Sequence, residues 1–266
     1  MDTTNVVQTF YRRAQTYDLD YAEYTVDIPF NVQLARELVS GAGQMLEFAC
    51  GTGRVTFALA KAGISITGVD ITPAMLKVAQ EKLTTLDEIR QRVRLLEGDM
   101  RNFDAGREQY QYVLIPFTSF LHLTDRKSQQ EALANAYAHL APDGHFLVDI
   151  FLPDVTHLAR NLGANWVNQE KAIERNNVLL VRWTATRYDQ ATQLMTGKWY
   201  YQMYDTTGEN RLIESYWVPM ELRVIFPAEW ELLLEQAGFR IVQKWGGFDR
   251  EPFGPKANRM LFLCQK

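Results

Sequence analysis

A short glycine-containing turn constrains the fold of this chain more than any other stretch. The apolar segment Met45–Phe48, which contains the acidic residue Glu47, runs into Ala-Cys-Gly-Thr-Gly at positions 49–53. An amphipathic segment over 55–62 follows at once, so the order predicts a buried strand, a tight turn and the start of a helix. The two glycines permit positive φ angles and close approach of a ligand to the backbone. The unpaired N–H groups of the helix start favour an electron-rich ligand.

Two classes of ligand use such a turn. Dinucleotides require Gly-x-Gly-x-x-Gly, but Thr56 stands at the third glycine, and Glu47 would repel a phosphate. The pattern Glu-x-x-x-Gly-x-Gly instead resembles motif I of the class I S-adenosylmethionine-dependent methyltransferases. In that family the acidic residue faces the cationic amino-acid end of the cofactor. The resemblance therefore implies that Glu47, Ala49, Gly51 and Gly53 contact S-adenosylmethionine.

Composition narrows the class of protein. The chain has 266 residues, 47% of them hydrophobic, and a formal net charge of −4. This size suits one large α/β domain with an insertion, or two small domains. No basic run predicts nucleic-acid binding. No apolar stretch approaches the roughly 20 residues that a membrane span needs.

The N-terminus and the cysteines indicate the compartment. The first residues lack a basic region followed by an apolar one, so we expect no signal peptide. Cys50 and Cys264 are the only cysteines, which is too few for a disulfide framework or a zinc site. We therefore expect a cytoplasmic protein without a bound metal.

A second strand is predicted over 64–70, and it ends in a carboxylate. A strand, helix, strand succession forms a right-handed parallel crossover, so Asp70 should emerge beside the glycine turn, where it could accept from both ribose hydroxyls. The residues after Asp70 resemble the second cofactor element of the family, with Thr72 as helix N-cap and Pro73 as first helical residue. The resemblance implies that Asp70, Ile71 and Met75 contact the cofactor.

Two further strands are predicted over 92–97 and 110–115. After the first, Asp99 and Met100 resemble the element that binds adenine in the family. After the second, Pro116 and Phe117 should lie where the carboxyl ends of the strands bind ligands, so the resemblance places them at the cofactor.

The segment 116–123 is also where methyl donor and acceptor should meet, with Phe120 and His122 facing the acceptor. It lacks the Asp/Asn-Pro-Pro-Tyr/Phe element of DNA and protein amide methyltransferases, which argues against a nucleobase or glutamine target. His122 could act as general base, or it could only pack at a helix start.

The pattern changes over 152–226. Strands are predicted over 178–188, 194–204 and 211–224, and their short connections make them antiparallel. Alternation places Trp199 and Tyr201 on one face, as candidate acceptor contacts, although this face could simply pack on the main domain. From residue 227 the α/β pattern returns, with a helix over 227–237 and strands over 239–245 and 259–264. Phe248, in the loop between these strands, is a further candidate acceptor contact.

The N-terminal residues 1–40 are predicted to be helical. They carry Tyr11, Tyr17 and Tyr21, and the segment resembles the Tyr-Asp elements that close over the cofactor in small-molecule methyltransferases. An aromatic face there could meet a sulfonium by cation–π attraction, with Tyr11 and Tyr17 at the cofactor and Tyr21 at the acceptor. The alternative is that this segment only packs on the core.

The predicted fold is therefore α/β: a Rossmann-like, seven-stranded, doubly wound sheet with an antiparallel last strand, and an antiparallel β insertion after the fifth strand. The predicted divisions are a helical cap at 1–40, the cofactor-binding domain at 41–151 and 227–266, and the insertion at 152–226. The insertion could serve as a lid, an acceptor pocket or a homodimer contact.

The expected activity is transfer of a methyl group from S-adenosylmethionine. The expected acceptor is a nitrogen or oxygen, with carbon less favoured, of a small aromatic or amine-containing metabolite. The place of the insertion resembles that in glycine and aminosugar N-methyltransferases. Two alternatives stay open: a non-catalytic S-adenosylmethionine-binding regulator, and a nicotinamide oxidoreductase, against which Glu47 and Thr56 count.

Overall fold

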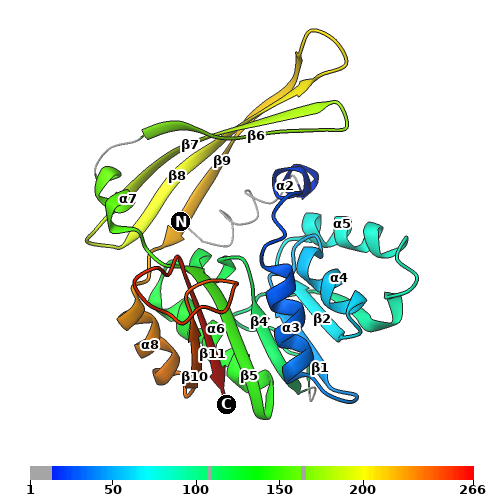
Figure 1. Ribbon diagram of the computed structural model, residues 1–266, viewed down its shortest axis with the longest axis vertical. Coiled ribbons are helices and arrows are strands. Elements are labelled where there is room, and N and C mark those ends of the chain that lie inside the picture. Colours follow the sequence, from blue (N-terminus) through cyan, green and yellow to red (C-terminus); the bar gives the residue numbers. More distant parts are fainter. Residues whose placement is uncertain (1–13, 107–108, 163–165) are drawn as a thin grey trace. The chain divides into compact units, whose positions relative to one another are not determined.

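The computed structural model describes residues 14–106, 109–162 and 166–266 (Figure 1). These residues form two compact units. One contains Tyr24–Pro153 and Ile225–Lys266, and the other contains Asp154–Val224 together with the described residues up to Glu23. The predicted division into cap, cofactor domain and insertion stays a prediction. The segment 1–40 contributes α2 (Ala14–Asp20) to the second unit and α3 (Ile28–Leu38) to the first.

The first unit, called the α/β unit below, is built on a 7-stranded sheet of order β10-β11-β5-β4-β1-β2-β3. Only β11 runs antiparallel to its neighbours; the other pairs are parallel. This confirms the predicted doubly wound sheet with an antiparallel last strand. The strands are β1 (Gln44–Phe48), β2 (Ser65–Asp70), β3 (Val93–Glu97), β4 (Tyr110–Ile115), β5 (Leu140–Phe151), β10 (Arg240–Trp245) and β11 (Arg259–Gln265).

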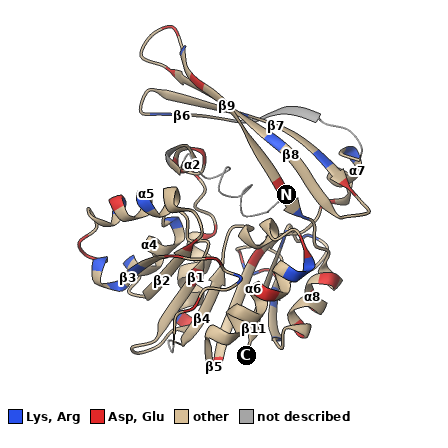
Figure 2. Cartoon of the chain, turned by 180° about the vertical axis from the view of Figure 1, so that it is seen from behind, with Lys and Arg blue, Asp and Glu red and all other residues tan. Residues whose placement is uncertain are grey.

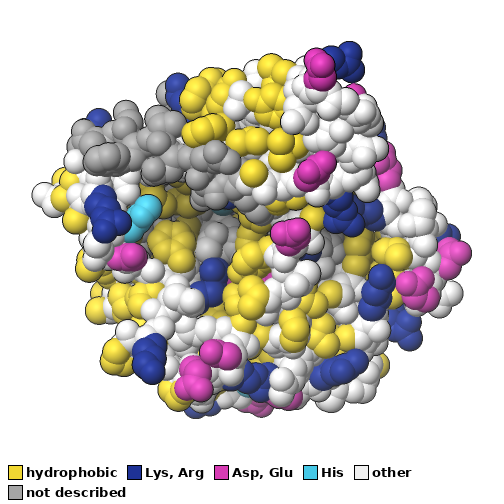
Figure 3. Space-filling model, turned by 45° about the horizontal axis from the view of Figure 1, so that its top comes forward, with side chains coloured by type: hydrophobic (Ala, Val, Ile, Leu, Met, Phe, Trp, Pro, Cys, Tyr) yellow, Lys and Arg dark blue, Asp and Glu magenta, His cyan; other side chains and the backbone are white. Residues whose placement is uncertain are grey.

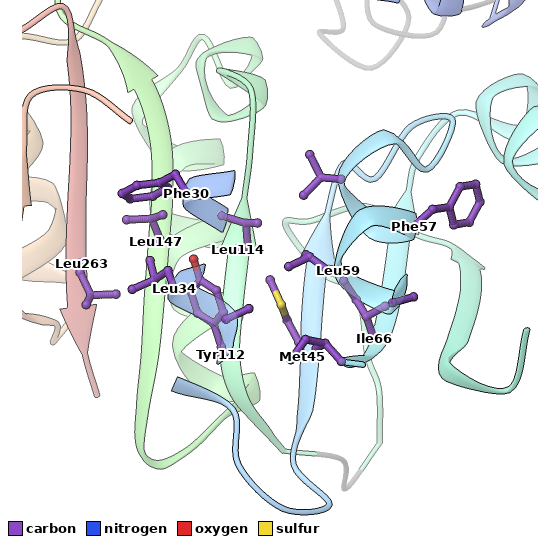
Figure 4. Close-up of a cluster of buried hydrophobic side chains, with 14 of the residues drawn as sticks. Phe30, Leu34, Met45, Phe57, Leu59, Ile66, Tyr112, Leu114, Leu147 and Leu263 are labelled. Carbon is purple, nitrogen blue, oxygen red and sulfur yellow. The ribbon is translucent and has the colours of Figure 1, made fainter. Parts of the chain in front are cut away.

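Helices cover both faces of this sheet. They are α3, α4 (Arg54–Lys61), α5 (Pro73–Leu83), α6 (Arg126–His139) and α8 (Pro227–Gln236), with short 3₁₀ turns η1 (Arg90–Arg92) and η2 (Ser119–His122). On one face, side chains of α3 and α4 such as Leu34 and Leu59 pack against strand residues that include Leu147 (Figure 4). The preceding strand residue, Phe146, points to the opposite face and stacks on Phe239. Strands buried on both faces explain the short apolar runs over 112–115 in β4 and 146–148 in β5.

The second unit, called the β unit below, is a 4-stranded antiparallel sheet of order β6-β7-β8-β9 with α2 and α7 (Val155–Arg160). Its strands are β6 (Trp166–Arg175), β7 (Val178–Asp189), β8 (Leu194–Asp205) and β9 (Arg211–Arg223). The last three match the predicted strands, whereas β6 and α7 were not predicted. Asn176 and Asn177, both with positive φ, make the tight hairpin between β6 and β7.

Alternation along β8 separates two aromatic faces, as predicted. Tyr201 is buried with Leu180 and Val218, and Leu19 of α2 packs on them. On the opposite face Tyr200 stacks on Trp217 with ring centroids 4.5 Å apart. One face of the sheet therefore forms a small core with α2.

Charged residues of both signs are interspersed along the chain (Figure 2). On the face shown in Figure 3, apolar side chains lie among acidic and basic ones. No helix within the described ranges is both long and apolar enough to cross a bilayer.

The glycine turn requires its glycines. Gly51 and Gly53 have φ angles of 56° and 86°, and Gly53 is the N-cap of α4. A Cβ at Gly53 would lie 2.4 Å from the ring of Phe57. Both the backbone angle and the available space therefore exclude larger residues at Gly53.

We expect Gly53→Ala to lower the free energy of unfolding by about 2–5 kcal/mol, because left-handed strain and a steric clash add. Gly63 is the matched control, since it has φ of 97° but nothing within 4 Å of its added Cβ. Gly63→Ala should cost only the backbone term of about 1–2 kcal/mol. Equal losses in urea unfolding would contradict the clash with Phe57.

Candidate active site

The carboxyl ends of three neighbouring parallel strands bring the predicted acidic residues to one edge of the sheet. Glu47 in β1 lies opposite Gly68 in β2, and Asp70 lies opposite Glu97 in β3. Asp99 follows β3 by two residues. The sequence order predicted this shared edge.

Asp70 is held by backbone amides from two different loops. Its side chain is 7% exposed; Oδ2 accepts from the Gly51 N–H at 2.8 Å and Oδ1 from the Thr72 N–H at 2.8 Å. Burial raises the pKa of the Asp70 carboxyl, and the two backbone hydrogen bonds oppose this shift. An ionised carboxylate has about four acceptor sites, so two stay available to a ligand with paired donors. Thr72 is the N-cap of α5 and Pro73 its first residue, as predicted.

Glu47 is more deeply buried than Asp70, at 1% exposure. It accepts a hydrogen bond of 2.6 Å from the hydroxyl of Thr56, in the first turn of α4. Burial raises its pKa to about 8, against the lowering effects of the Thr56 hydrogen bond and the Arg54 charge. Within the described part of the chain, Glu47 forms no ion pair. A cationic ligand group would be favoured beside it.

Asp99 differs from Glu47 and Asp70 because an arginine already engages it. Arg101 donates through Nε to Oδ2 at 2.9 Å, and its backbone N–H donates to Oδ1 at 2.9 Å. The carbonyl of Met100 accepts from the Asn135 side chain of α6 at 3.0 Å. An incoming donor would therefore share the Asp99 carboxylate with Arg101, a residue that sequence reasoning missed.

The remaining predicted cofactor contacts surround the glycine turn. Ala49 has φ of 57°, which is unusual for a residue with a Cβ. Met75 is buried, and its Cε would lie 3.2 Å from a Cβ at Gly51, so it packs against the turn. Ile71 follows Asp70 and is partly exposed.

A second turn follows β4, beside the glycine turn in the sheet order. Pro116 is buried and Phe117 is partly exposed. The ring of Phe117 lies 4.8 Å from that of Tyr24, and the Arg54 guanidinium lies 4.9 Å from it. Pro116 and Phe117 are thus at the predicted edge of the sheet.

The three predicted acceptor contacts of the α/β unit differ in how far they are exposed to a ligand. Phe120 is completely buried against Trp230 of α8, so it offers no surface to an acceptor. His122 ends η2 and is partly exposed. Phe248 packs on Phe30 and lines a hollow of about 1390 Å³ formed by the β10–β11 loop and Tyr24.

The other predicted aromatic contacts belong to the β unit. Arg182 lies 4.5 Å from the ring of Trp199 and donates to the hydroxyl of Tyr21 at 3.2 Å. Tyr201 donates to Asp20 at 2.9 Å, and Asp20 also pairs with Arg182. Trp199, Tyr21 and Tyr201 therefore gather around one buried ion pair. The ring of Tyr17 lies 4.8 Å from that of Tyr21, and Tyr11 lies outside the described residues.

Sequence reasoning missed two buried ion pairs of the α/β unit, Asp27 with Arg54 and Asp149 with Arg259. Asp149 gave a usable signal, because an acid inside the apolar run 146–151 must find a partner. The described residues contain no group of three or more His, Cys, Asp or Glu side chains that could hold a metal ion.

Comparison with known proteins assigns the part of the chain that forms this edge to a protein family. Residues 45–144, which contain the glycine turn and all three strand-end acids, match the sequence model of a family described as "Methyltransferase domain". The chain is a class I S-adenosylmethionine-dependent methyltransferase.

Similar proteins agree with this assignment. The methyltransferase is 31% identical over 143 residues to dTDP-3-amino-3,6-dideoxy-alpha-D-glucopyranose N,N-dimethyltransferase of Streptomyces fradiae, covering 51% of the chain and 52% of that relative. It is 24% identical to dTDP-3-amino-3,4,6-trideoxy-alpha-D-glucopyranose N,N-dimethyltransferase of Streptomyces venezuelae, covering 88% and 92%. The structure of the CcbJ methyltransferase of Streptomyces caelestis matches with a TM-score of 0.73 and 25% identity, covering 90% and 88%.

The raised pKa of Glu47 predicts a pH-dependent stability. A carboxyl group with a higher pKa in the folded chain than in the unfolded chain costs stability as pH rises between the two values. The methyltransferase should therefore lose free energy of unfolding, relative to Glu47→Gln, between the ordinary value of 4.5 and about 8. The Gln side chain can still accept from Thr56, so the difference reports the charge.

Urea unfolding at several pH values tests this expectation. Glu97→Gln removes an exposed carboxylate from β3, which is separated from β1 by β2, and is the control. A wild-type curve that runs parallel to the Glu47→Gln curve across this range would rule out the shift.

Proposed function

We propose that this methyltransferase transfers its methyl group to the amine nitrogen of a small polar metabolite, of the amino-sugar type. The observation that carries the cofactor part is the Asp70 carboxylate, fixed by Gly51 and Thr72 at the end of β2. The acceptor part is supported by the printed names of two relatives, which are both amino-sugar N,N-dimethyltransferases.

The residues at the strand ends fit the three parts of the cofactor. Glu47 would bind the ammonium group of the cofactor, and Asp70 would accept hydrogen bonds from its ribose hydroxyls. Asp99 and Met100 would bind its adenine. Gly51 and Gly53 leave space where a Cβ would stand. The further proposed cofactor contacts are Ala49, Ile71, Met75, Pro116, Phe117, Tyr11 and Tyr17.

S-Adenosylmethionine supplies an electrophilic methyl group, so the residues of this chain need only bind, orient and dehydrate the reactants. An amine can reach the site already deprotonated, and a base helps when it does not. His122, at the end of η2, is the candidate base. An oxygen acceptor would depend on such a base more strongly.

The acceptor would also meet aromatic side chains. Phe248, at the hollow beside Tyr24, is a proposed contact in the α/β unit, and Tyr21 and Trp199 are proposed contacts from the β unit. Phe120 and Tyr201 are not proposed as contacts, because both side chains are buried. A homodimer through the β unit stays a prediction.

Removing the Asp70 carboxylate should weaken cofactor binding. We expect Asp70→Ala to reduce the affinity for S-adenosylhomocysteine by about 1–3 kcal/mol, since hydrogen bonds to a charged acceptor are lost. Glu97→Gln is the control. It changes the residue that lies opposite Asp70 on β3, and it should bind S-adenosylhomocysteine with normal affinity. Calorimetric titration of both variants, with thermal unfolding to verify folding, measures this. Unchanged affinity in folded Asp70→Ala would remove the ribose assignment.

Turnover tests the acceptor class. The enzyme, given methyl-labelled S-adenosylmethionine, should label dTDP-linked amino sugars in preference to the matching hydroxy sugars and simple phenols. With an amine acceptor, His122→Ala should lower the rate most near neutral pH, where the amine still arrives protonated but a histidine can be neutral and accept its proton. Tight binding of S-adenosylhomocysteine without transfer to any amine or hydroxyl would favour a cofactor-binding regulator instead.

A further inference from the structure

The turn after β4 has a backbone conformation that its residues do not favour. Ser119 N–H donates to the Pro116 carbonyl at 3.2 Å, and the two central residues, Phe117 and Thr118, have φ angles of 54° and 60°. Two left-handed central residues are typical of a type I′ turn, which prefers Asn and Gly. A β-branched threonine with positive φ is a rare outlier. Such a conformation persists only where its surroundings impose it.

Asp149 of β5 imposes it on the backbone. Its Oδ2 accepts from the Phe117 N–H at 3.0 Å, and its carbonyl accepts from the Thr118 N–H at 2.8 Å. The Asp149 side chain is 1% exposed. The two left-handed residues thus give both of their amide hydrogens to one buried residue.

Arg259 of β11 holds the Asp149 carboxyl group in place. Its Nε donates to Oδ1 at 2.5 Å, on the side of the carboxylate that Phe117 does not use. Burial raises the pKa of Asp149, and the Arg259 charge and hydrogen bond oppose that rise. Each carboxylate oxygen therefore has a separate structural partner.

Arg54 holds the same turn through the side chain of Phe117. The guanidinium lies over that ring and is itself fixed by two hydrogen bonds of 2.7 Å to Asp27. Arg54 is the first residue of α4, directly after Gly53 of the glycine turn. One side chain therefore links the glycine turn to the turn after β4.

We propose that Asp149 and Arg54 are positioning residues, which hold the Pro116–Ser119 turn in a preorganised conformation on the acceptor side of the transferred methyl group. The proposal rests on the function proposed above, because it assumes that the cofactor occupies the neighbouring glycine turn. Neither Asp149 nor Arg54 needs to touch the acceptor.

Amide hydrogen exchange tests the structural half of the proposal. In Asp149→Asn, one side-chain oxygen is replaced by a donor, so it cannot accept from both Phe117 and Arg259. The Phe117 and Thr118 amides should exchange at least roughly tenfold faster than in the wild type, as expected for local opening. Asp143→Asn is the control, an exposed aspartate at the other end of β5. Unchanged exchange in Asp149→Asn would overturn the holding role.

Sinefungin tests the functional half without a known acceptor, since it carries an amine-bearing carbon in place of the methyl-bearing sulfur. In Asp149→Asn we expect sinefungin to bind about tenfold more weakly, while the affinity for S-adenosylhomocysteine changes by less than about threefold. Equal effects on both ligands, or no effect on either, would overturn positioning on the acceptor side. Failure of the wild type to bind S-adenosylhomocysteine would instead refute the proposed function.

A rescue variant separates positioning from general damage. Asparagine tolerates positive φ, so Thr118→Asn should restore most of the sinefungin affinity when added to Asp149→Asn. Thr118→Asn alone should raise the thermal midpoint above that of the wild type, because it relieves backbone strain at this position. This measurement tests the strain even if Asp149→Asn does not fold. No increase in the midpoint, or no recovery of affinity in a folded double variant, would contradict the proposal.

Discussion

The geometry of the active edge depends on the hydrogen bonds of the buried Asp70 carboxylate. A buried carboxylate needs donors, and here they are the amides of Gly51, from the loop after β1, and Thr72, from the loop after β2. Because one rigid side chain spans both loops, it fixes the glycine turn relative to the start of α5. A ligand that uses the two remaining acceptor sites would therefore meet a preformed surface.

Charges along this edge are compensated in two different ways. Asp27, Asp99 and Asp149 are each paired with an arginine. Glu47 and Asp70, in the part of the chain that the structure describes, depend on a hydroxyl and on backbone amides. A positively charged ligand group would therefore be stabilised most at the ends of β1 and β2, where the acids have no arginine partner among the described residues. This matches a sulfonium cofactor with a cationic amino-acid end, and it explains why a dinucleotide phosphate would be repelled.

The sequence was most informative where local geometry controls the outcome. Glycines at fixed spacing and acids at the ends of apolar runs predicted the shared edge, because parallel strands bring their carboxyl ends together. It was least informative about contacts between distant residues. Arg54 finds Asp27 across 27 positions, and Arg259 finds Asp149 across 110. Phe120 was expected at the acceptor, but η2 turns it onto Trp230, which no periodicity could indicate.

The buried ion pairs are better explained by orientation than by stability. Removing two charges from water costs about as much as their attraction returns, so apolar residues of the same volume would often stabilise the fold equally well. An apolar pair in place of Asp149 and Arg259 could not accept from Phe117, and the left-handed turn after β4 would lose the bond that holds its first amide. A hydrogen-bonded ion pair fixes the orientation of the groups that it contacts, whereas an apolar pair does not. The fold therefore places these buried pairs where a fixed direction matters, at the turns that follow β1 and β4.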